Sequence, residues 1–323
     1  MRCLCCGKKI KENADIQERD NSWHNKCIKS FFGTSLMPMI DISEEQLEEL
    51  AKDTVNKGLT VPGVQKKLSL HLSSINDARL TIVNYPTGYI LKPQTEEYDS
   101  LPEFEDLAMR LAEIAGIQTV PHALVKIKGN FAYITKRIDR NINKDKMSMY
   151  AMEDFCQLSN RLTQDKYKGS YEGCARIIAK YSSMPGLDVS ELFLRVVLSF
   201  IIGNSDMHLK NFSLIETEPA GRIFRLSQAY DMLPVNIILP QDEEEMALTV
   251  NGKKRNIGKK DFKVFAKNCG ITEPAAEKMM KKLCSLSEKY MEQCELSYLS
   301  DELKEKTKDL ILERIKILTG VRD

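Results

Sequence analysis

Hydrophobic and polar residues alternate with a period of two in several short stretches of the first half of the chain. Residues 67–72 alternate in this way, and residues 78–83 and 88–92 are short runs rich in strand-forming residues. Successive side chains of a strand point to opposite faces, so this period predicts strands with one face against a core. Two more strands are predicted at residues 123–127 and 131–136, joined by a tight turn that contains a glycine.

Apolar residues spaced three or four positions apart predict two helices in the same half of the chain. One begins at a capping box at Ser43 and ends at Gly58. The other follows a second capping box, formed by Ser100 and Glu103, and carries apolar residues at helical spacing over 104–115. The first half therefore mixes a sheet with helices.

From about residue 149 onward the pattern is mostly helical. Residues 191–203 are apolar nearly all round, which predicts a helix buried inside a lobe. Short strands are predicted at 212–215 and 222–226, and three amphipathic helices over 258–319. A strand-rich half followed by a helix-rich half predicts an α+β, bilobal fold with a cleft between the lobes.

Composition excludes several classes of protein. The chain has 323 residues, 42% of them apolar and 29% charged, which is typical of a globular protein and not of a collagen-like or disordered one. The 47 Lys and Arg residues balance the 46 Asp and Glu residues, which argues against a protein that mainly coats nucleic acid or anionic membrane. The chain has neither a run of about 18 apolar residues nor the apolar core of a secretory signal, so we expect it in the cytoplasm.

Cysteines gather at the front of the chain. Cys3 and Cys6 form one pair with two residues between them, and His24 and Cys27 form another. Pairs of this kind present two ligands each to a tetrahedral zinc ion, and four protein ligands leave no open position, so the predicted site is structural. Cys5 is a spare thiol that could replace Cys3 or Cys6. The alternative is a set of free thiols.

The polar stretch 203–213 lies between the predicted buried helix and a predicted strand. Asp206 and Asn211 have the spacing at which a phosphotransferase places the Asp that accepts the hydroxyl proton and the Asn that binds Mg²⁺. Lys210 could neutralise charge on the phosphoryl group. Asp231 follows a predicted strand, where a kinase places its other metal-binding carboxylate. The alternative is that Asp206 and Asn211 only cap a turn.

A strand lysine and a helix glutamate extend this pattern. Lys92 ends a predicted strand, and Glu105 lies on the helix that follows. In kinases such a lysine contacts the α- and β-phosphates and the glutamate holds it in place. The segment 60–68, which leads into a predicted strand, contains one glycine and two lysines, and these residue types suit contact with phosphate oxygens. By itself, however, this segment resembles a surface turn.

Six motifs occur in order along the chain: GVQKK (63–67), ILKP (90–93), LPEFEDLAMRLA (101–112), ITKRIDR (134–140), GNSDMHLKNFS (203–213) and AYDMLP (229–234). The set resembles the HipA family of bacterial Ser/Thr protein kinases, the toxins of type II toxin–antitoxin systems. The resemblance covers residues 55 to 310, approximately. It implies a protein-kinase-like, HipA-like fold with a strand-rich nucleotide lobe and a helical C-terminal lobe.

The resemblance also implies a role for each matching residue. Asp206 would be the general base, and Asn211 and Asp231 would hold Mg²⁺. The ATP-binding residues would be Pro62, Gly63, Val64, Gln65, Lys66 and Lys67 in the phosphate loop, Lys92 with Glu105, the hinge Lys136, Arg137 and Ile138, and His208 and Lys210 near the phosphates. Thr60 stands where family members carry a regulatory serine, so autophosphorylation is expected there.

The front of the chain departs from the family. Long members begin with a small β-rich subdomain for which this chain has no room, so it is more similar to the short HipT-like form, in which that subdomain can be a separate protein. The resemblance implies ATP- and Mg²⁺-dependent phosphorylation of a protein such as an aminoacyl-tRNA synthetase or translation factor. It also implies a helix-turn-helix antitoxin partner, through which DNA is bound indirectly. Lys136 departs as well, since an acidic residue is frequent there.

We expect three parts: a zinc-binding-like segment at residues 1–40, a nucleotide-binding lobe at 41–148 and a helical lobe with the catalytic loop at 149–323. Two other functions stay open. A catalytically idle subunit of a repressor complex would bind ATP without turnover, and a small-molecule kinase would consume ATP with metabolites and not with proteins.

Overall fold

The computed structural model describes residues 1–41, 67–72, 79–81, 88–143 and 146–320. Contacts divide the chain into two compact units. We call Met1–Asp106 with Val120–Ile138 the sheet unit, and Leu107–Thr119 with Asp139–Asp323 the helical unit. The predicted mixture of a strand-rich and a helix-rich part is confirmed, whereas the three expected domain boundaries stay a prediction.

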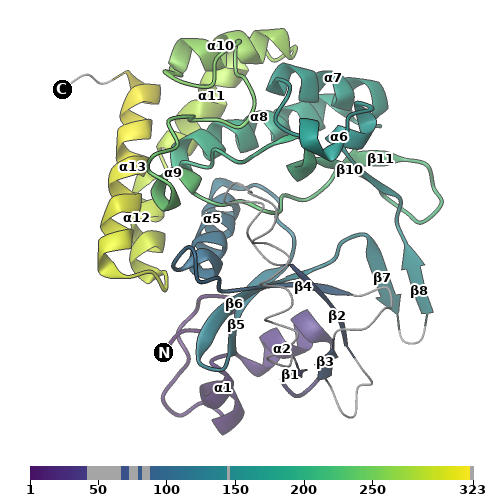
Figure 1. The fold of residues 1–323 in the computed structure, drawn as a ribbon, viewed down its shortest axis with the longest axis vertical. Coiled ribbons are helices and arrows are strands. Elements are labelled where there is room, and N and C mark those ends of the chain that lie inside the picture. The colour runs from purple at the N-terminus through teal and green to yellow at the C-terminus, as the bar shows by residue number, and fades with distance from the viewer. Residues whose placement is uncertain (42–66, 73–78, 82–87, 144–145, 321–323) are drawn as a thin grey trace. The chain divides into compact units, whose positions relative to one another are not determined.

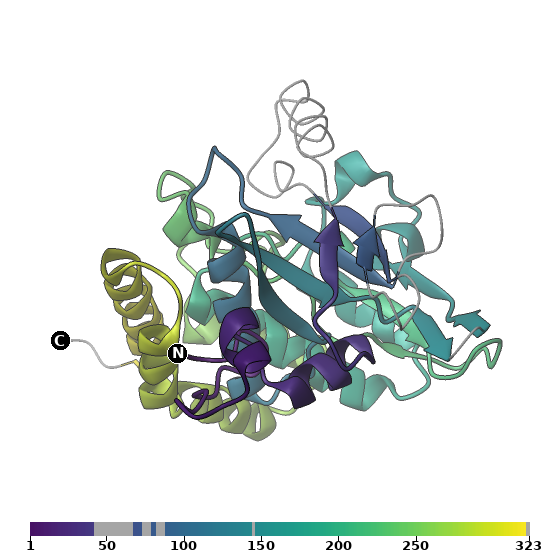
Figure 2. The same cartoon turned by 90° about the horizontal axis from the view of Figure 1, so that it is seen from below.

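The sheet unit contains a six-stranded sheet in the order β1-β3-β2-β4-β6-β5 (Figures 1 and 2). Its strands are β1 (Met39–Asp41), β2 (Leu68–Leu72), β3 (Arg79–Thr81), β4 (Tyr89–Pro93), β5 (His122–Ile127) and β6 (Asn130–Lys136). The β5–β6 turn has positive φ at both Lys128 and Gly129, as a two-residue hairpin turn requires. The five strands expected from alternation are confirmed. The parallel pairing of β1 with β3 was not predicted.

The helix α5 (Leu101–Ala115) is also confirmed, and the chain passes along it from the sheet unit into the helical unit. The capping geometry expected at its start is wrong. Ser100 has a φ of +59°, in the left-handed region, and not the extended backbone of a capping serine. Its carbonyl still accepts a hydrogen bond from the amide of Phe104 at 3.0 Å. The helix predicted after Ser43 lies outside the described residues.

The helical unit is built around α8 (Pro185–Ile202), which is buried on nearly all sides as predicted. It begins six residues earlier than expected, because Pro185 occupies its first turn, where a missing amide hydrogen costs nothing. The same unit contains α6 (Phe155–Leu158), α7 (Tyr171–Tyr181), α9 (Val235–Ile238), the 3₁₀ turns η1 (Thr163–Asp165) and η2 (Leu209–Asn211), and the sheet β11-β10-β9, made of β9 (Met152–Asp154), β10 (Ser213–Glu216) and β11 (Phe224–Leu226). A separate hairpin joins β7 (Arg140–Asn143) to β8 (Lys146–Met149).

The C-terminal region contains four helices and not the three expected, in a stretch that is described throughout. They are α10 (Lys259–Asn268), α11 (Glu273–Cys284), α12 (Ser287–Leu296) and α13 (Asp301–Thr319). Gly270, at φ +77°, separates the first two, and the Ser300 hydroxyl caps α13. The amphipathic pattern continues across these short breaks, which is why the sequence did not separate all four. In Figure 1, α12 and α13 run side by side, and α13 also packs against α8.

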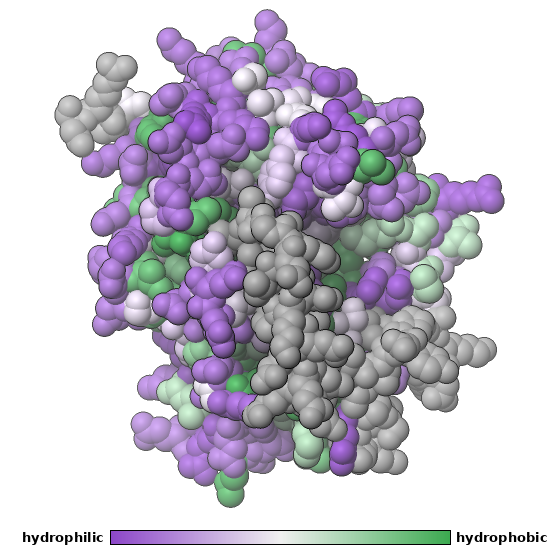
Figure 3. Space-filling model, in the orientation of Figure 1, coloured by the Kyte–Doolittle hydropathy of each residue, from purple (hydrophilic) through white to green (hydrophobic). Residues whose placement is uncertain are grey.

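None of the helices in the described ranges is long and apolar enough to cross a membrane. On the face drawn in Figure 3, the described residues present mostly hydrophilic side chains with scattered apolar ones.

Candidate active site

The predicted catalytic loop, residues 203–213, follows directly from the end of α8. Gly203 ends this helix with a φ of +71°, and a Cβ added there would lie 2.4 Å from a methyl carbon of Leu310. Glycine adopts this positive φ without strain, and a larger residue would also displace the Leu310 side chain, so Gly203 suits the turn from the helix into the loop. Asp206, His208 and Asn211 are all buried, with Asp206 8% exposed.

Asp206 is held through its backbone on both sides. Its amide donates to Oδ1 of Asn204 at 3.2 Å, and its carbonyl accepts from Nδ2 of Asn211 at 2.9 Å. The second bond uses the nitrogen end of the Asn211 amide, so the oxygen end is turned away from Asp206. The hydrogen bond between Asn211 and Asp206 thus closes a loop, as expected of residues that cap a turn. The same bond also fixes the direction of the Asn211 amide oxygen.

Tyr167 is a functional candidate that sequence reasoning missed. Its hydroxyl donates to Oδ1 of Asp206 at 2.6 Å, and its ring packs edge-on against His208 at a centroid distance of 5.0 Å. Nε2 of His208 lies 3.9 Å from Oδ2 of Asp206. No motif marks Tyr167, which stands 39 residues before Asp206 in a polar loop.

Asp231 is tied to this loop through its neighbour Tyr230. The hydroxyl of the half-buried Tyr230 forms hydrogen bonds with Oγ of Ser213 at 2.6 Å and with the carbonyl of Lys210 at 3.1 Å. It therefore contacts one residue before Asn211 and one residue after it in the chain. Burial raises the pKa of Tyr230, so the phenol keeps its proton. Asp231 has a φ of +58°, an uncommon conformation for a non-glycine residue and one that is frequent at functional sites.

Lys210 contacts a carboxylate other than those of the predicted site. Its Nζ lies 2.5 Å from Oδ2 of Asp154. The other oxygen of Asp154 accepts from the amide of Gln157 and caps α6. Contact of Lys210 with a phosphoryl group stays a prediction, and it would require this ion pair to open.

In the sheet unit, Lys92 of β4 and Glu105 of α5 form the predicted pair. Nζ of Lys92 lies 2.5 Å from Oε1 of Glu105, and their side chains are only 4% and 1% exposed. Nζ also lies 5.5 Å from the centroid of the Tyr133 ring. A buried ion pair contributes little to net stability, but it fixes the position of the lysine, because either charge alone would be costly to bury.

The predicted hinge coincides with a boundary of the fold. The sheet unit ends at Ile138, directly after β6. The amide of Lys136 donates to the carbonyl of Pro121, and that of Arg137 to the carbonyl of Gly88, both at 2.9 Å. These two amides are therefore engaged, so a backbone donor to adenine is expected at Ile138. Burial lowers the pKa of the Lys136 ammonium.

Most of the predicted phosphate loop falls outside the part of the chain that the structure describes. Thr60 and residues 62–66 lie outside the described residues. Lys67 is described and is exposed just before β2.

A basic pocket that was not predicted borders the catalytic loop at Leu209. The cavity has a volume of about 440 Å³, and its wall includes Arg161, Arg176 and Lys180 as well as the start of α7. Three cationic side chains around one hollow favour an anionic group as its occupant.

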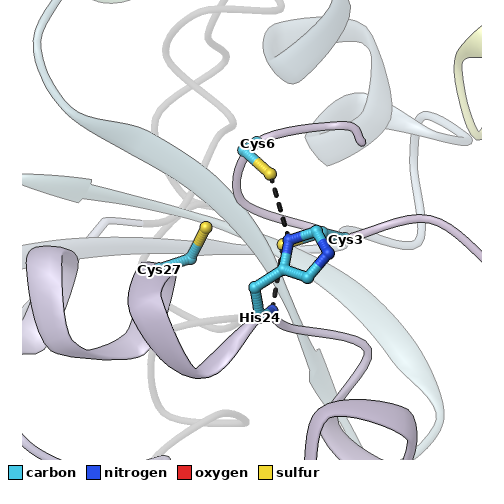
Figure 4. Close-up of side chains that lie close together, drawn as sticks. All are labelled: Cys3, Cys6, His24 and Cys27. Carbon is cyan, nitrogen blue, oxygen red and sulfur yellow. Dashed lines mark hydrogen bonds between the residues drawn. The ribbon is translucent and has the colours of Figure 1, made fainter. Parts of the chain in front are cut away.

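The four predicted zinc ligands come together in the sheet unit (Figure 4). The ligand atoms of Cys3, Cys6, His24 and Cys27 all lie within 4.8 Å of one another. Burial opposes ionisation of Cys6, but hydrogen bonds with the Lys8 backbone and the His24 side chain outweigh it and lower the Cys6 pKa to about 7. Burial, and then the neighbouring cysteines, raise the pKa of the Cys27 thiol.

Comparison with solved structures identifies the class of fold. The HipA of the Shewanella oneidensis MR-1 toxin–antitoxin system, solved with HipB and operator DNA, superposes with a TM-score of 0.73 over 86% of this chain and 71% of its own, at 18% identity. CtkA, a proinflammatory kinase of Helicobacter pylori, superposes with a TM-score of 0.53 over 77% of this chain and 93% of its own, at 15% identity. The fold is therefore HipA-like and kinase-like.

Residues 59–291 match the model of the HipA-like C-terminal domain, and the chain belongs to this family. A Haemophilus influenzae protein named "Putative kinase" is 28% identical over 69% of this chain and 70% of its own length. Two Sinorhizobium fredii proteins, named "Putative kinase Y4mE" and "Putative kinase Y4dM", are 25% and 32% identical to this chain. Y4mE matches 77% of this chain and 63% of its own length, and Y4dM 61% and 49%.

Proposed function

We propose that this protein is a Mg²⁺-dependent kinase that transfers the γ-phosphoryl group of ATP to a Ser or Thr hydroxyl of another protein. The observation that carries this proposal is the catalytic loop, in which Asp206 is buried and fixed by Asn211 while Tyr230 ties the segment of Asp231 to the same loop. Membership of the HipA-like family supports it.

Asp206 acts as the general base. Its Oδ1 already accepts a hydrogen bond from the hydroxyl of Tyr167, so an acceptor Ser or Thr hydroxyl can donate to the same carboxylate in the same way. The hydroxyl oxygen forms a bond to the γ-phosphorus as the bond from that phosphorus to the β–γ bridging oxygen breaks. The proton passes to Asp206, and ADP is released.

Asn211 and Asp231 have the donor atoms that Mg²⁺ prefers, an amide and a carboxylate oxygen. The hydrogen bond from Nδ2 of Asn211 to the Asp206 carbonyl fits this role, because it turns the amide oxygen toward the opposite side. Mg²⁺ supplies charge neutralisation on the β- and γ-phosphates when bound.

The remaining ATP contacts follow from residues that match the family. Lys92, steadied by Glu105, would contact the α- and β-phosphates, and Ile138 with its hinge neighbours would meet adenine. His208 and Lys210 would line the phosphates, together with residues 62–67 of the loop before β2. Thr60 stays the expected autophosphorylation site.

The acceptor would be a protein of the translation machinery, such as an aminoacyl-tRNA synthetase, and the kinase would act in the cytoplasm as a toxin. HipA of Shewanella oneidensis was solved with HipB and operator DNA, which supports a helix-turn-helix antitoxin as partner and DNA contact through it. A separate protein resembling the N-terminal subdomain of long HipA-family members is a further expected partner. The basic pocket beside Leu209 suits an acidic patch of the substrate.

Intact-protein mass spectrometry after incubation with ATP and Mg²⁺ tests the proposal. Wild type, starting unmodified, is expected to gain one phosphoryl group and to label proteins of a cell lysate. Asp206→Asn is expected to do neither, while the exposed carboxylate variant Asp301→Asn behaves as wild type. Thr60→Ala is expected to lose the mass gain and to keep the labelling of lysate proteins.

Two outcomes would contradict the proposal. If wild type binds ATP but labels neither itself nor a lysate, an idle nucleotide-binding subunit is favoured. If a metabolite panel consumes ATP while proteins do not, the enzyme is a small-molecule kinase.

A further inference from the structure

We propose that Cys3, Cys6, His24 and Cys27 form a closed structural zinc site that holds two backbone turns against β5, the last strand of the six-stranded sheet; we call these two turns and their bonds to Leu124 the clasp. The donor atoms, three sulfurs and one imidazole nitrogen, come within 4.8 Å of one another (Figure 4). Zn–S bonds of about 2.3 Å and Zn–N bonds of about 2.0 Å imply donor separations of about 3.4–3.8 Å in a tetrahedron. The distance from Sγ of Cys6 to Nδ1 of His24 is already 3.3 Å.

Two tight backbone turns present these ligands. Cys3 and Cys6 lie in a knuckle closed by hydrogen bonds from the Cys3 amide to the Lys8 carbonyl at 2.9 Å and from the Gly7 amide to the Cys3 carbonyl at 2.8 Å. His24 precedes α2 (Asn25–Phe32), and Cys27 lies in its first turn. The His24 amide also donates to Sγ of Cys3 at 3.3 Å, as backbone amides do to metal-bound thiolates. Each turn supplies two ligands, so one ion would join both turns.

The same two turns hold one residue of the sheet edge. Leu124 lies on β5, which is the last strand of the sheet order. Its amide donates to the carbonyl of Leu4, between Cys3 and Cys6, and its carbonyl accepts from Nε1 of Trp23, next to His24; both distances are 3.1 Å. An ion that joins the two ligand pairs would therefore hold both halves of this clasp against β5, the last strand in the sheet order.

Aromatic packing connects the clasp to β4, the strand that carries Lys92. Phe31 and Phe32 of α2 pack on Trp23 and on Tyr89 of β4, with ring centroids 4.9–5.9 Å apart within this cluster. The Tyr89 hydroxyl donates to the Phe31 carbonyl at 3.2 Å. Figure 2 shows α2 lying along the sheet. The ion would thus support the strand on which the proposed ATP-binding lysine stands.

Three thiolates and one imidazole in a tetrahedron favour zinc over harder cations, and four protein ligands leave no position for water or substrate. Elemental analysis of the full-length protein, purified without chelator, is expected to find about one zinc per chain. Cys6→Ser and His24→Ala are expected to lose it, and His24→Cys to keep it. Cys5→Ser is the matched control, because Cys5 lies within the same knuckle but outside the ligand set, and it should keep zinc.

Cobalt tests the geometry if the variants fail to fold. Wild type stripped by a chelator under reducing conditions should take up Co²⁺ in a one-to-one ratio and show the visible absorption of a tetrahedral thiolate site. A chain that contains no zinc and takes up no Co²⁺ overturns the proposal, as does a native mass that is lower by two hydrogens, which signifies a disulfide. Loss of zinc from Cys5→Ser equal to that from Cys6→Ser overturns the ligand set.

Hydrogen exchange tests the clasp itself. Removing zinc should speed exchange of the Leu4 and Leu124 amides by at least about tenfold, because their protection depends on local opening, while amides in the middle of α8 stay unchanged. The thermal midpoint followed by Trp23 fluorescence should fall by at least about 5 °C. Unchanged exchange at Leu124 would overturn the clasp. Phosphoryl transfer enters none of these readouts, so the zinc site and the kinase proposal fail independently.

Discussion

Lys92 and Asp206 are both buried ionisable groups, but they are held in opposite ways. Lys92 forms an ion pair with Glu105, and both side chains are almost completely buried. Asp206 is held by neutral hydrogen-bonding groups, through its backbone by Asn204 and Asn211 and through its carboxylate by Tyr167. A charged partner pairs with the first group, and neutral donors hold the second.

The difference predicts different kinds of failure. Removing the counter-ion of a buried charge leaves that charge poorly compensated, which destabilises the fold. Removing one of several neutral donors leaves the backbone bonds in place, so the fold survives and the loss falls on catalysis. Substitutions at the Lys92 site should therefore mainly lower the stability of the fold, whereas substitutions at the Asp206 site should mainly lower the catalytic rate.

Asp206→Asn is expected to have the largest effect. An amide cannot accept the hydroxyl proton, and general-base catalysis contributes about 10²- to 10⁴-fold, so kcat should fall by that factor while the unfolding midpoint stays near wild type. Steady-state kinetics on a labelled protein substrate measures this. Asp301→Asn, an exposed carboxylate, is the control and should retain full activity. A strongly lowered midpoint would show that Asp206 serves the fold.

Glu105→Ala tests the ion-paired site. Removing the buried counter-ion of Lys92 should cost about 3–5 kcal/mol of stability. Trp23, the one tryptophan of the chain, lies in the sheet unit, so urea unfolding followed by its fluorescence reports on that unit.

The double variant Lys92→Met with Glu105→Leu sharpens this test. It replaces both charges by apolar groups of similar volume, so stability should return to within about 1 kcal/mol of wild type. Kinase activity should stay lost, because no lysine is present. If activity returned with stability, Lys92 would have no part in ATP binding.

Tyr167→Phe should have a smaller effect. A hydrogen bond to a charged group contributes about 1.5–3 kcal/mol, so kcat/KM should fall by about ten- to a hundredfold at nearly unchanged stability. Tyr150→Phe is the matched control and should be silent. An increase in activity with Tyr167→Phe would mean that the tyrosine blocks the carboxylate.

Arg161→Ala with Arg176→Ala should have the smallest effect. Both side chains are exposed on the wall of the basic pocket, so we expect KM for an acidic protein substrate to rise by about two- to tenfold with kcat unchanged. Lys278→Ala with Lys281→Ala removes two charges on α11, away from the pocket wall, and should leave KM as it is. An equal rise in KM in both double variants would mean that the pocket residues act only through the overall positive charge of the protein and not through contact with the substrate.

The local elements of the fold were largely predictable. The alternation at 67–72 and the apolar run at 191–203 correspond to β2 and α8, because each pattern matches one secondary-structure period. The three-residue strand β1 was missed, since its pairing depends on β3 far along the chain. Three helices were predicted over 258–319 where the structure has four, because the amphipathic pattern continues across the short breaks between them.

For the candidate site, the sequence by itself determined which residue types stand at the required spacings: Asp206 with Asn211, and Cys3 with Cys6. Such spacings are read within one turn, where the backbone alone brings the side chains together. Only the tertiary structure decided that Tyr167 reaches Asp206, that Tyr230 joins two segments, and that Leu124 contacts both halves of the cysteine cluster. These contacts join residues up to 101 positions apart, and packing of whole elements, not any local pattern, brings them within hydrogen-bonding distance.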